Sequence, residues 1–227
     1  NIYWQAADGT GSVERLTNSP MAQFAHALTP DGSRVLVFQA SGAATTAADI
    51  MTFSLTRPSS GRGEQTPGAT ALSPLIQTTF NEWLPEVSPD GRWLAYATNE
   101  SGQNEVHVRP FPNVNDRRWP ISTGGGTKPV WARNGRELFY LDGAFNLMSV
   151  PVQTTGSAFI AGNPVKLLEP RYYVGAAPNR AYDVSRDGRF LMIKDSMAAG
   201  QTENAPPPSL VVVLNWFEEL KAKLPGR

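Results

Sequence analysis

Apolar triplets recur at four places along the chain, each a few residues after a glycine. They are Val35-Leu36-Val37, Leu94-Ala95-Tyr96, Leu138-Phe139-Tyr140 and Leu191-Met192-Ile193. Because alternate residues of a strand face opposite sides of a sheet, three consecutive apolar residues predict a strand that is buried on both faces. The pattern therefore indicates several sheets stacked face to face.

The same kind of turn precedes each triplet. Its four versions are Thr29-Pro30-Asp31-Gly32, Ser88-Pro89-Asp90-Gly91, Ala132-Arg133-Asn134-Gly135 and Ser185-Arg186-Asp187-Gly188. In such a turn, Asp or Asn bonds back to nearby amides, and Gly adopts the positive φ that lets the chain reverse. Repeats of about 40 to 50 residues are typical of propeller blades. We therefore predict an all-β fold, a β-propeller of four-stranded antiparallel blades with about four full blades.

Each turn is expected to join the first and second strands of a blade. The first strands then end at Leu28, Val87, Trp131 and Val184, and the triplets form the second strands. Third strands are predicted at 50–55, 105–109, 146–150 and 210–214, and fourth strands near 71–72, 118–121 and 165–168. The predicted blades are 22–78, 79–122, 125–169 and 170–214.

The two ends of the chain break the four-strand pattern. Residues 1–5 and 14–17 resemble a third and a fourth strand, so 1–17 is predicted to be a partial blade of a single propeller, 1–227, that begins inside a blade. Residues 215–224 place Trp216, Phe217, Leu220 and Leu224 on one helical stripe and predict a short C-terminal helix. Because unpaired strand edges invite pairing with another chain, we expect a homo-oligomer with Trp4 and Trp216 in its interface.

Charge and composition limit the classes of partner. Twenty basic residues balance twenty acidic ones, so no net field favours nucleic acid or an anionic membrane. Cysteine is absent, which removes disulfides and thiolate chemistry. No apolar run approaches the ~20 residues of a membrane span. We expect a soluble protein of the bacterial cytoplasm or periplasm.

One blade carries a family resemblance. The segment from Trp83 to Tyr96, continued by Asn99-Glu100-Ser101-Gly102 and by 106–112, resembles the TolB-like, WD-repeat-like β-propeller family. It is also similar to the C-terminal propellers of bacterial serine/threonine protein kinases, as are 124–131 and 214–220. Arg133 and Arg186 replace the proline of the family turn. This change is compatible with the turn but removes the restraint that proline places on φ at the second position. The resemblance implies the fold, while the kinase's own signatures are absent from the sequence.

Catalytic motifs such as a nucleophile elbow or a phosphate loop are also absent from the sequence. His26 lies at the inner end of a first strand and is a candidate catalytic base. Side chains near the starts of first strands would line a central channel, and the ligand-binding candidates are Gln23, Glu82, Lys128, Asn179 and Arg180. Glu86 and Asp183 share one repeat position and are candidate ligands for calcium or another divalent metal, which prefers oxygen donors. Alternatively, these carboxylates pair with Lys128 or Arg180.

These features leave three functional hypotheses. The first is a non-catalytic interaction or sensor module without a cofactor, part of a larger bacterial protein such as a receptor-type kinase, whose partner is a protein or a small polar ligand at the channel mouth. The second is a metal-dependent hydrolase of phosphotriesters, sulfate esters or carboxyl esters with its site in the channel. The third is a propeller that binds a sugar or a peptide, for which exposed tryptophans would provide a stacking surface.

Overall fold

A computed structural model describes residues 1–40, 48–55, 71–170, 172–175 and 179–194. Within these ranges the chain forms eighteen strands and no helix, so none of the described segments is a helix able to span a membrane. The predicted third strand at 210–214, the predicted helix at 215–224 and Trp216 lie outside the described residues.

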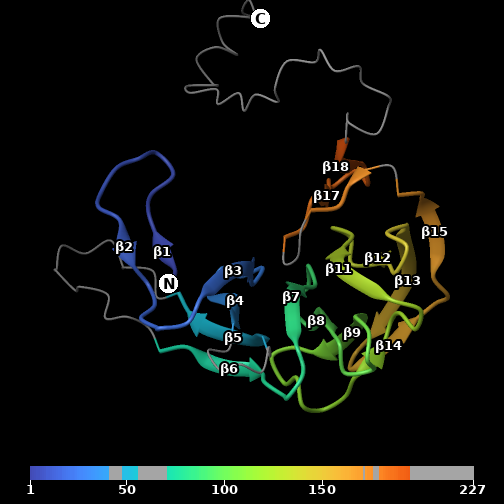
Figure 1. The fold of residues 1–227 in the computed structure, drawn as a ribbon, viewed down its shortest axis with the longest axis horizontal. Helices are drawn as coiled ribbons and strands as arrows, with labels where there is room; N and C mark the ends of the chain where they lie inside the picture. Colours follow the sequence, from blue (N-terminus) through green and yellow to red (C-terminus); the bar gives the residue numbers. More distant parts are fainter. Residues whose placement is uncertain (41–47, 56–70, 171, 176–178, 195–227) are drawn as a thin grey trace, which may run out of the picture. The chain divides into compact units, whose positions relative to one another are not determined.

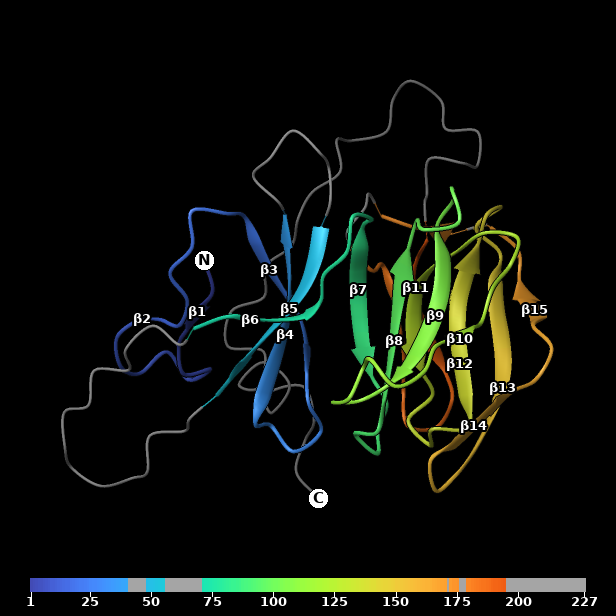
Figure 2. The same ribbon diagram turned by 90° about the horizontal axis from the view of Figure 1, so that it is seen from below.

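Figures 1 and 2 show the sheets following one another in chain order within residues 1–194. A two-stranded sheet pairs β1 (Tyr3–Trp4) with β2 (Glu14–Arg15), and the assignment of 1–17 as a partial blade stays a prediction. The next sheet has the order β3-β4-β5-β6, formed by Gln23–Leu28, Arg34–Ala40, Ala48–Ser54 and Ser73–Ile76. A second four-stranded sheet has the order β10-β9-β8-β7, formed by Trp119–Pro120, Glu105–Pro110, Trp93–Thr98 and Glu82–Val87.

The following sheet is larger than predicted. Its strands are β11 (Gly126–Trp131), β12 (Glu137–Asp142), β13 (Leu147–Thr155), β14 (Ala158–Ala161) and β15 (Val165–Leu168). Long β13 pairs with β12, and it also pairs with β15 near its start and with β14 near its end, so this strand has three partners. The sequence pattern predicted β15 but missed β14. The predicted strand at 71–72 was also misplaced, since β6 begins at Ser73.

The last described sheet has the order β16-β18-β17, formed by Tyr172–Tyr173, Phe190–Lys194 and Tyr182–Val184. Its first and second strands were predicted correctly. The pairing of β16 with the outer edge of β18 was not predicted.

All four predicted turns form, and their glycines have φ between 69° and 81°. The fourth turn is shorter than the others. Ser88 N bonds to Trp93 O and Ala132 N to Glu137 O, five residues on, whereas Ser185 N bonds to Arg189 O, four residues on. A shift of one residue turns each side chain of a strand to the opposite face. As a result, Phe190 and Met192 contact the preceding sheet.

This shift overturns one prediction of the sequence analysis. Leu94 and Leu138 are fully buried, but Leu191, at the same repeat position, is 76% exposed. Ile193 is also exposed. The triplet of the last repeat is therefore not buried on both faces in the described structure, although the first three triplets are largely buried.

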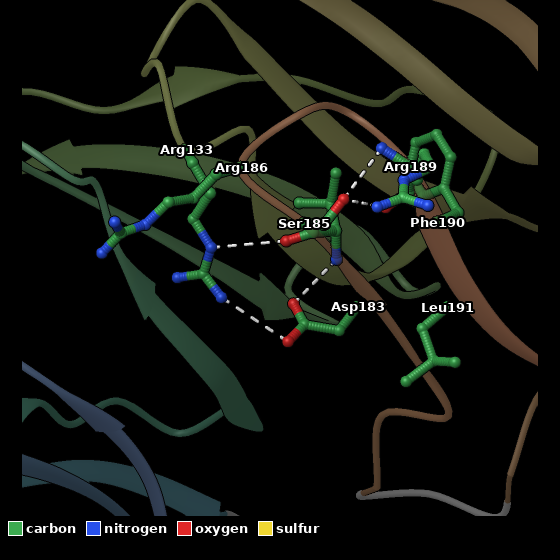
Figure 3. A pocket seen from close by; sticks show the side chains of 8 residues that line it. Arg133, Asp183, Ser185, Arg186, Arg189, Phe190 and Leu191 are labelled. Carbon is green, nitrogen blue, oxygen red and sulfur yellow. Dashed lines mark hydrogen bonds and ion pairs between the residues drawn. The ribbon is translucent and has the colours of Figure 1, made fainter. Parts of the chain in front are cut away.

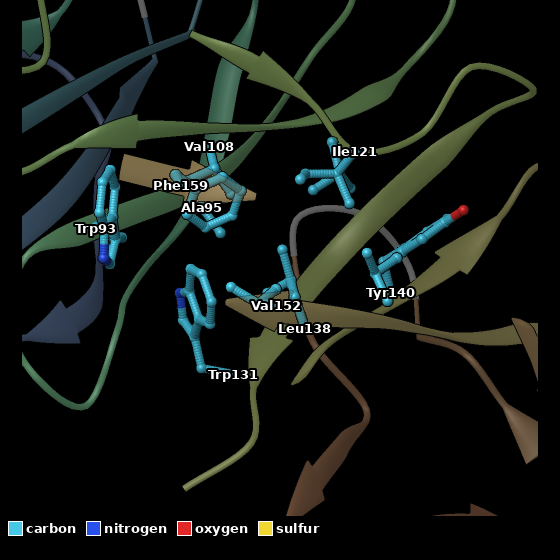
Figure 4. Close-up of a cluster of buried hydrophobic side chains, with 11 residues drawn as sticks. Trp93, Ala95, Val108, Ile121, Trp131, Leu138, Tyr140, Val152 and Phe159 are labelled. Carbon is cyan, nitrogen blue, oxygen red and sulfur yellow. The ribbon is translucent and has the colours of Figure 1, made fainter. Parts of the chain in front are cut away.

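Apolar clusters hold neighbouring sheets together. Figure 4 shows the cluster between the β7–β10 and β11–β15 sheets, where the ring of Phe159 lies 5.0 Å from Trp93 and 5.3 Å from Trp119 between ring centroids. Trp93 and Trp131 are both buried in this core. Similar clusters join β3–β6 to β7–β10 and β11–β15 to β16–β18. The stacked sheets thus bury the apolar faces predicted from the first three triplets.

Candidate functional site

The two candidate metal ligands lie close to arginines from other sheets. Glu86 is near the end of β7, just after a bulge that separates it from Trp83 in the pairing with β8. Asp183 is in the middle of β17, and Arg180 precedes that strand by two residues. We call Glu86, Arg133, Arg180 and Asp183 the arginine–carboxylate cluster.

Arg180 is the centre of this cluster. Its Nη1 donates a hydrogen bond of 2.9 Å to Glu86 Oε2, and its Nη2 lies 3.9 Å from Asp183 Oδ1. Arg133 reaches Asp183 from the other side, with Nη2 at 3.5 Å from Oδ2. The alternative in which the carboxylates pair with Arg180 is therefore the arrangement observed.

Burial dominates the electrostatics of Glu86. Removal from water raises the pKa of this carboxyl above its usual value, while the charge and hydrogen bond of Arg180 act in the opposite direction. The backbone of Glu86 is also held, because Trp131 Nε1 donates to its carbonyl oxygen over 3.1 Å. The cluster thus joins β7, β11 and β17 through both side chains and main chain.

Lys128 and Asn179 form a second group. Lys128 sits in a bulge of β11 with a left-handed φ of 56°, and its Nζ donates to the carbonyl oxygens of Val174, Gly175 and Asn179. An ammonium has three protons, so these three bonds use its full donor capacity. Burial lowers the pKa of Lys128. The role that this geometry gives Lys128 is to anchor the segment before β17 to β11.

The other candidates belong to separate hydrogen-bond networks. Gln23 accepts from the Thr17 hydroxyl over 2.6 Å and donates to Gln39 over 2.9 Å, which ties the β1–β2 sheet to β3 and β4. Glu82 is buried and accepts from the hydroxyl of Thr78, and burial raises its pKa. The His26 ring is half-buried, with its edge toward Phe38 at 6.3 Å between centroids. The catalytic role of His26 stays a prediction.

Among the described residues, no group of three or more His, Asp or Glu side chains is arranged to hold a metal ion. The metal assignment of Glu86 and Asp183 stays a prediction, and any cation there would meet the guanidinium of Arg180 between the two carboxylates.

A pocket that the sequence did not predict borders this cluster. It has a volume of about 750 Å³ and lies between the β11–β12 turn and the β17–β18 hairpin (Figure 3). We call it the basic pocket; its lining consists of Arg133, Asp183, Val184, Ser185, Arg186, Arg189, Phe190 and Leu191. The sequence contained one signal for it, since Arg133 and Arg186 stand where the first two turns carry proline.

Comparisons with known proteins bear on the fold. No protein-family model and no curated protein matches the chain. Among solved structures, TolB from Acinetobacter baumannii is similar with a TM-score of 0.55 and 15% identity, over 82% of this chain and 41% of TolB. A puromycin-hydrolysing peptidase from Mycobacterium tuberculosis is similar with a TM-score of 0.57 and 20% identity, over 82% of this chain and 30% of the peptidase.

The chain thus spans less than half of the length of either protein. At such low identity the likeness shows the fold and nothing of the chemistry. Together with the stacked antiparallel sheets, it identifies the chain as an all-β protein with a TolB-like β-propeller fold.

Proposed function

We propose that this chain is a non-catalytic interaction module built on a propeller. The observation that carries the proposal is the position of Arg180, which pairs with Glu86 and approaches Asp183. A guanidinium between two carboxylates neutralises their negative charge. A hydrolytic metal centre would instead need the carboxylate oxygens free to coordinate the cation. Lys128 likewise donates all its protons to backbone carbonyls, so it serves the architecture.

The competing function is the metal-dependent ester hydrolase. Calcium or zinc bound to Glu86 and Asp183 would have to displace Arg180 from its 2.9 Å hydrogen bond. The two hypotheses therefore make opposite predictions for the same two side chains.

The test is a panel of chromogenic phosphotriesters, sulfate esters and carboxyl esters, with the purified chain supplied with calcium or zinc and then with excess chelator. We expect no turnover above the buffer rate under any condition. Turnover that disappears with chelator, and in both Glu86→Gln and Asp183→Asn while the fold persists, would establish the hydrolase instead.

The setting of the module follows from the sequence resemblance. The similarity of 83–112, 124–131 and 214–220 to kinase-attached propellers supports a place in a larger bacterial protein such as a receptor-type kinase, in the cytoplasm or the periplasm. We also propose that the module forms a homo-oligomer. Tyr3, Trp4 and Val13 are each more than half exposed, so the segment 1–17 presents apolar groups for such a contact.

A further inference from the structure

Two turns of the repeat share a substitution, and the fold brings them together. Pro30 and Pro89 hold the second position of the first two turns, where the third and fourth turns have Arg133 and Arg186. Both arginines line the basic pocket (Figure 3). A proline at this position would fix φ and add no charge. The substitution therefore places two guanidinium groups at one pocket on neighbouring sheets.

The positive charge of the basic pocket is only partly neutralised. Arg189 pairs with Asp187 over 2.8 Å. Arg133 lies 3.5 Å from Asp183 and donates to the Val184 carbonyl oxygen over 3.3 Å, and it remains half-exposed. The guanidinium of Arg186 makes no hydrogen bond or ion pair within the described part of the chain. The pocket thus has donors available for an anion.

The same pocket has an apolar side. Phe190 and Leu191 belong to its lining, and the short fourth turn leaves Leu191 76% exposed. An exposed leucine beside free guanidinium donors matches a ligand that carries an acidic group next to an apolar one. Asp183 also lines the pocket. Its negative charge repels a bound dianionic phosphate more strongly than it repels a singly charged carboxylate, so the pocket favours the carboxylate.

We propose that the basic pocket binds an acidic segment of a protein partner, with a carboxylate of the partner on Arg133 and Arg186 and an adjacent apolar side chain against Leu191. The inference rests on the proposed function of the chain as an interaction module. Arginine suits this role because its planar fork donates two parallel hydrogen bonds to one carboxylate.

The test uses the whole chain and a fluorescein-labelled peptide of alternating Asp and Leu, with fluorescence anisotropy as the readout. We expect binding that weakens with salt. Arg186→Ala should weaken the binding about tenfold, because hydrogen bonds to a charged group are lost. Since Arg186 has no described side-chain partner, this change leaves the fold intact, which thermal melting verifies.

Arg136→Ala is the matched control. Arg136 is an exposed arginine of the β11–β12 turn that lies outside the basic pocket, so its removal should leave the peptide affinity unchanged. Leu191→Ser should weaken binding of the peptide that contains Leu. It should leave the binding of a control peptide of alternating Asp and Gly unchanged.

Three results would overturn the proposal. The first is the absence of peptide binding to the wild type, and the second is an equal loss of affinity in Arg186→Ala and Arg136→Ala. The third is displacement of the peptide by inorganic phosphate at concentrations where acetate has no effect, which would identify a phosphate site. Ester turnover would refute the proposed function independently of these outcomes.

Discussion

Arg180, two residues before β17, donates a hydrogen bond of 2.9 Å to Glu86 in β7, although the β11–β15 sheet lies between the sheets of β7 and β17 in chain order. Both side chains are largely removed from water, with 27% and 17% of their surfaces exposed. Partial burial strengthens the attraction between them and makes the loss of one partner costly. The pair therefore contributes to holding β7 and β17 together.

Arg180→Gln should lower the free energy of unfolding by about 1–3 kcal/mol, because Glu86 would lose its charged partner in a partly buried site. Adding Glu86→Gln should recover part of this loss, since the second change removes the unpaired charge. Urea unfolding of the two single variants and the double variant measures the coupling. If the losses of the two single variants sum to the loss of the double variant within about 0.5 kcal/mol, the two side chains do not interact.

Gly91→Ala should destabilise the fold by about 1–2 kcal/mol, because a side chain in the left-handed region is strained. Gly91 has a φ of 72°, and the other three repeat turns use glycine in the same way. The control is Gly124→Ala, at a site where an added Cβ meets no atom within 4 Å and φ is not positive. Equal unfolding midpoints for the two variants would contradict the assigned turn.

Leu191→Ala should change stability by less than about 0.5 kcal/mol, since Leu191 is mostly exposed. Leu138→Ala, at the equivalent position of the preceding repeat, should cost about 2–5 kcal/mol because Leu138 is fully buried. Thermal melts of the two variants test the shifted register of β18. A comparable loss of stability in both variants would mean that β18 pairs with β17 in the same register as β12 with β11, with Leu191 buried.

His107 should make stability depend on pH. Burial, aided by the charge of Arg118, lowers the pKa of His107 to about 4. Between pH 6.5 and 4 the unfolded chain therefore binds a proton that the folded chain does not, so this contribution is complete above pH 6.5 and is lost as the pH falls toward 4. The loss amounts to about 3 kcal/mol for this shift. His107→Gln should flatten the dependence of the unfolding free energy on pH in this window, and an unchanged slope would contradict the burial of a neutral imidazole.

Local signals predicted most of the fold. The turns and the first three triplets located the first and second strands, because turn chemistry and double burial depend on residues that are neighbours in sequence. The exposure of Leu191 could not be predicted, since it depends on a one-residue difference in hydrogen bonding between turns of the same composition. Phe159 was missed because β14 pairs with an extension of β13 that has no apolar triplet.

The candidate site was predicted in part. Glu86 and Asp183 were named because they share a repeat position, and Arg180 because it precedes a first strand; the structure brings the three together. The partner of each could not be read from the sequence, because Glu86 and Arg180 are 94 residues apart. The basic pocket was not predicted, although two of its three arginines, Arg133 and Arg186, depart from the turn motif in the sequence.

Calcium titration of the wild-type chain, followed by thermal melting, tests the central claim most directly. If Arg180 neutralises Glu86 and Asp183, millimolar calcium should leave the melting temperature unchanged, because the carboxylates are not available to a cation. A rise in melting temperature with calcium that is absent in both Glu86→Gln and Asp183→Asn would contradict the account. It would show that the metal replaces Arg180 and that the cluster is a cation site.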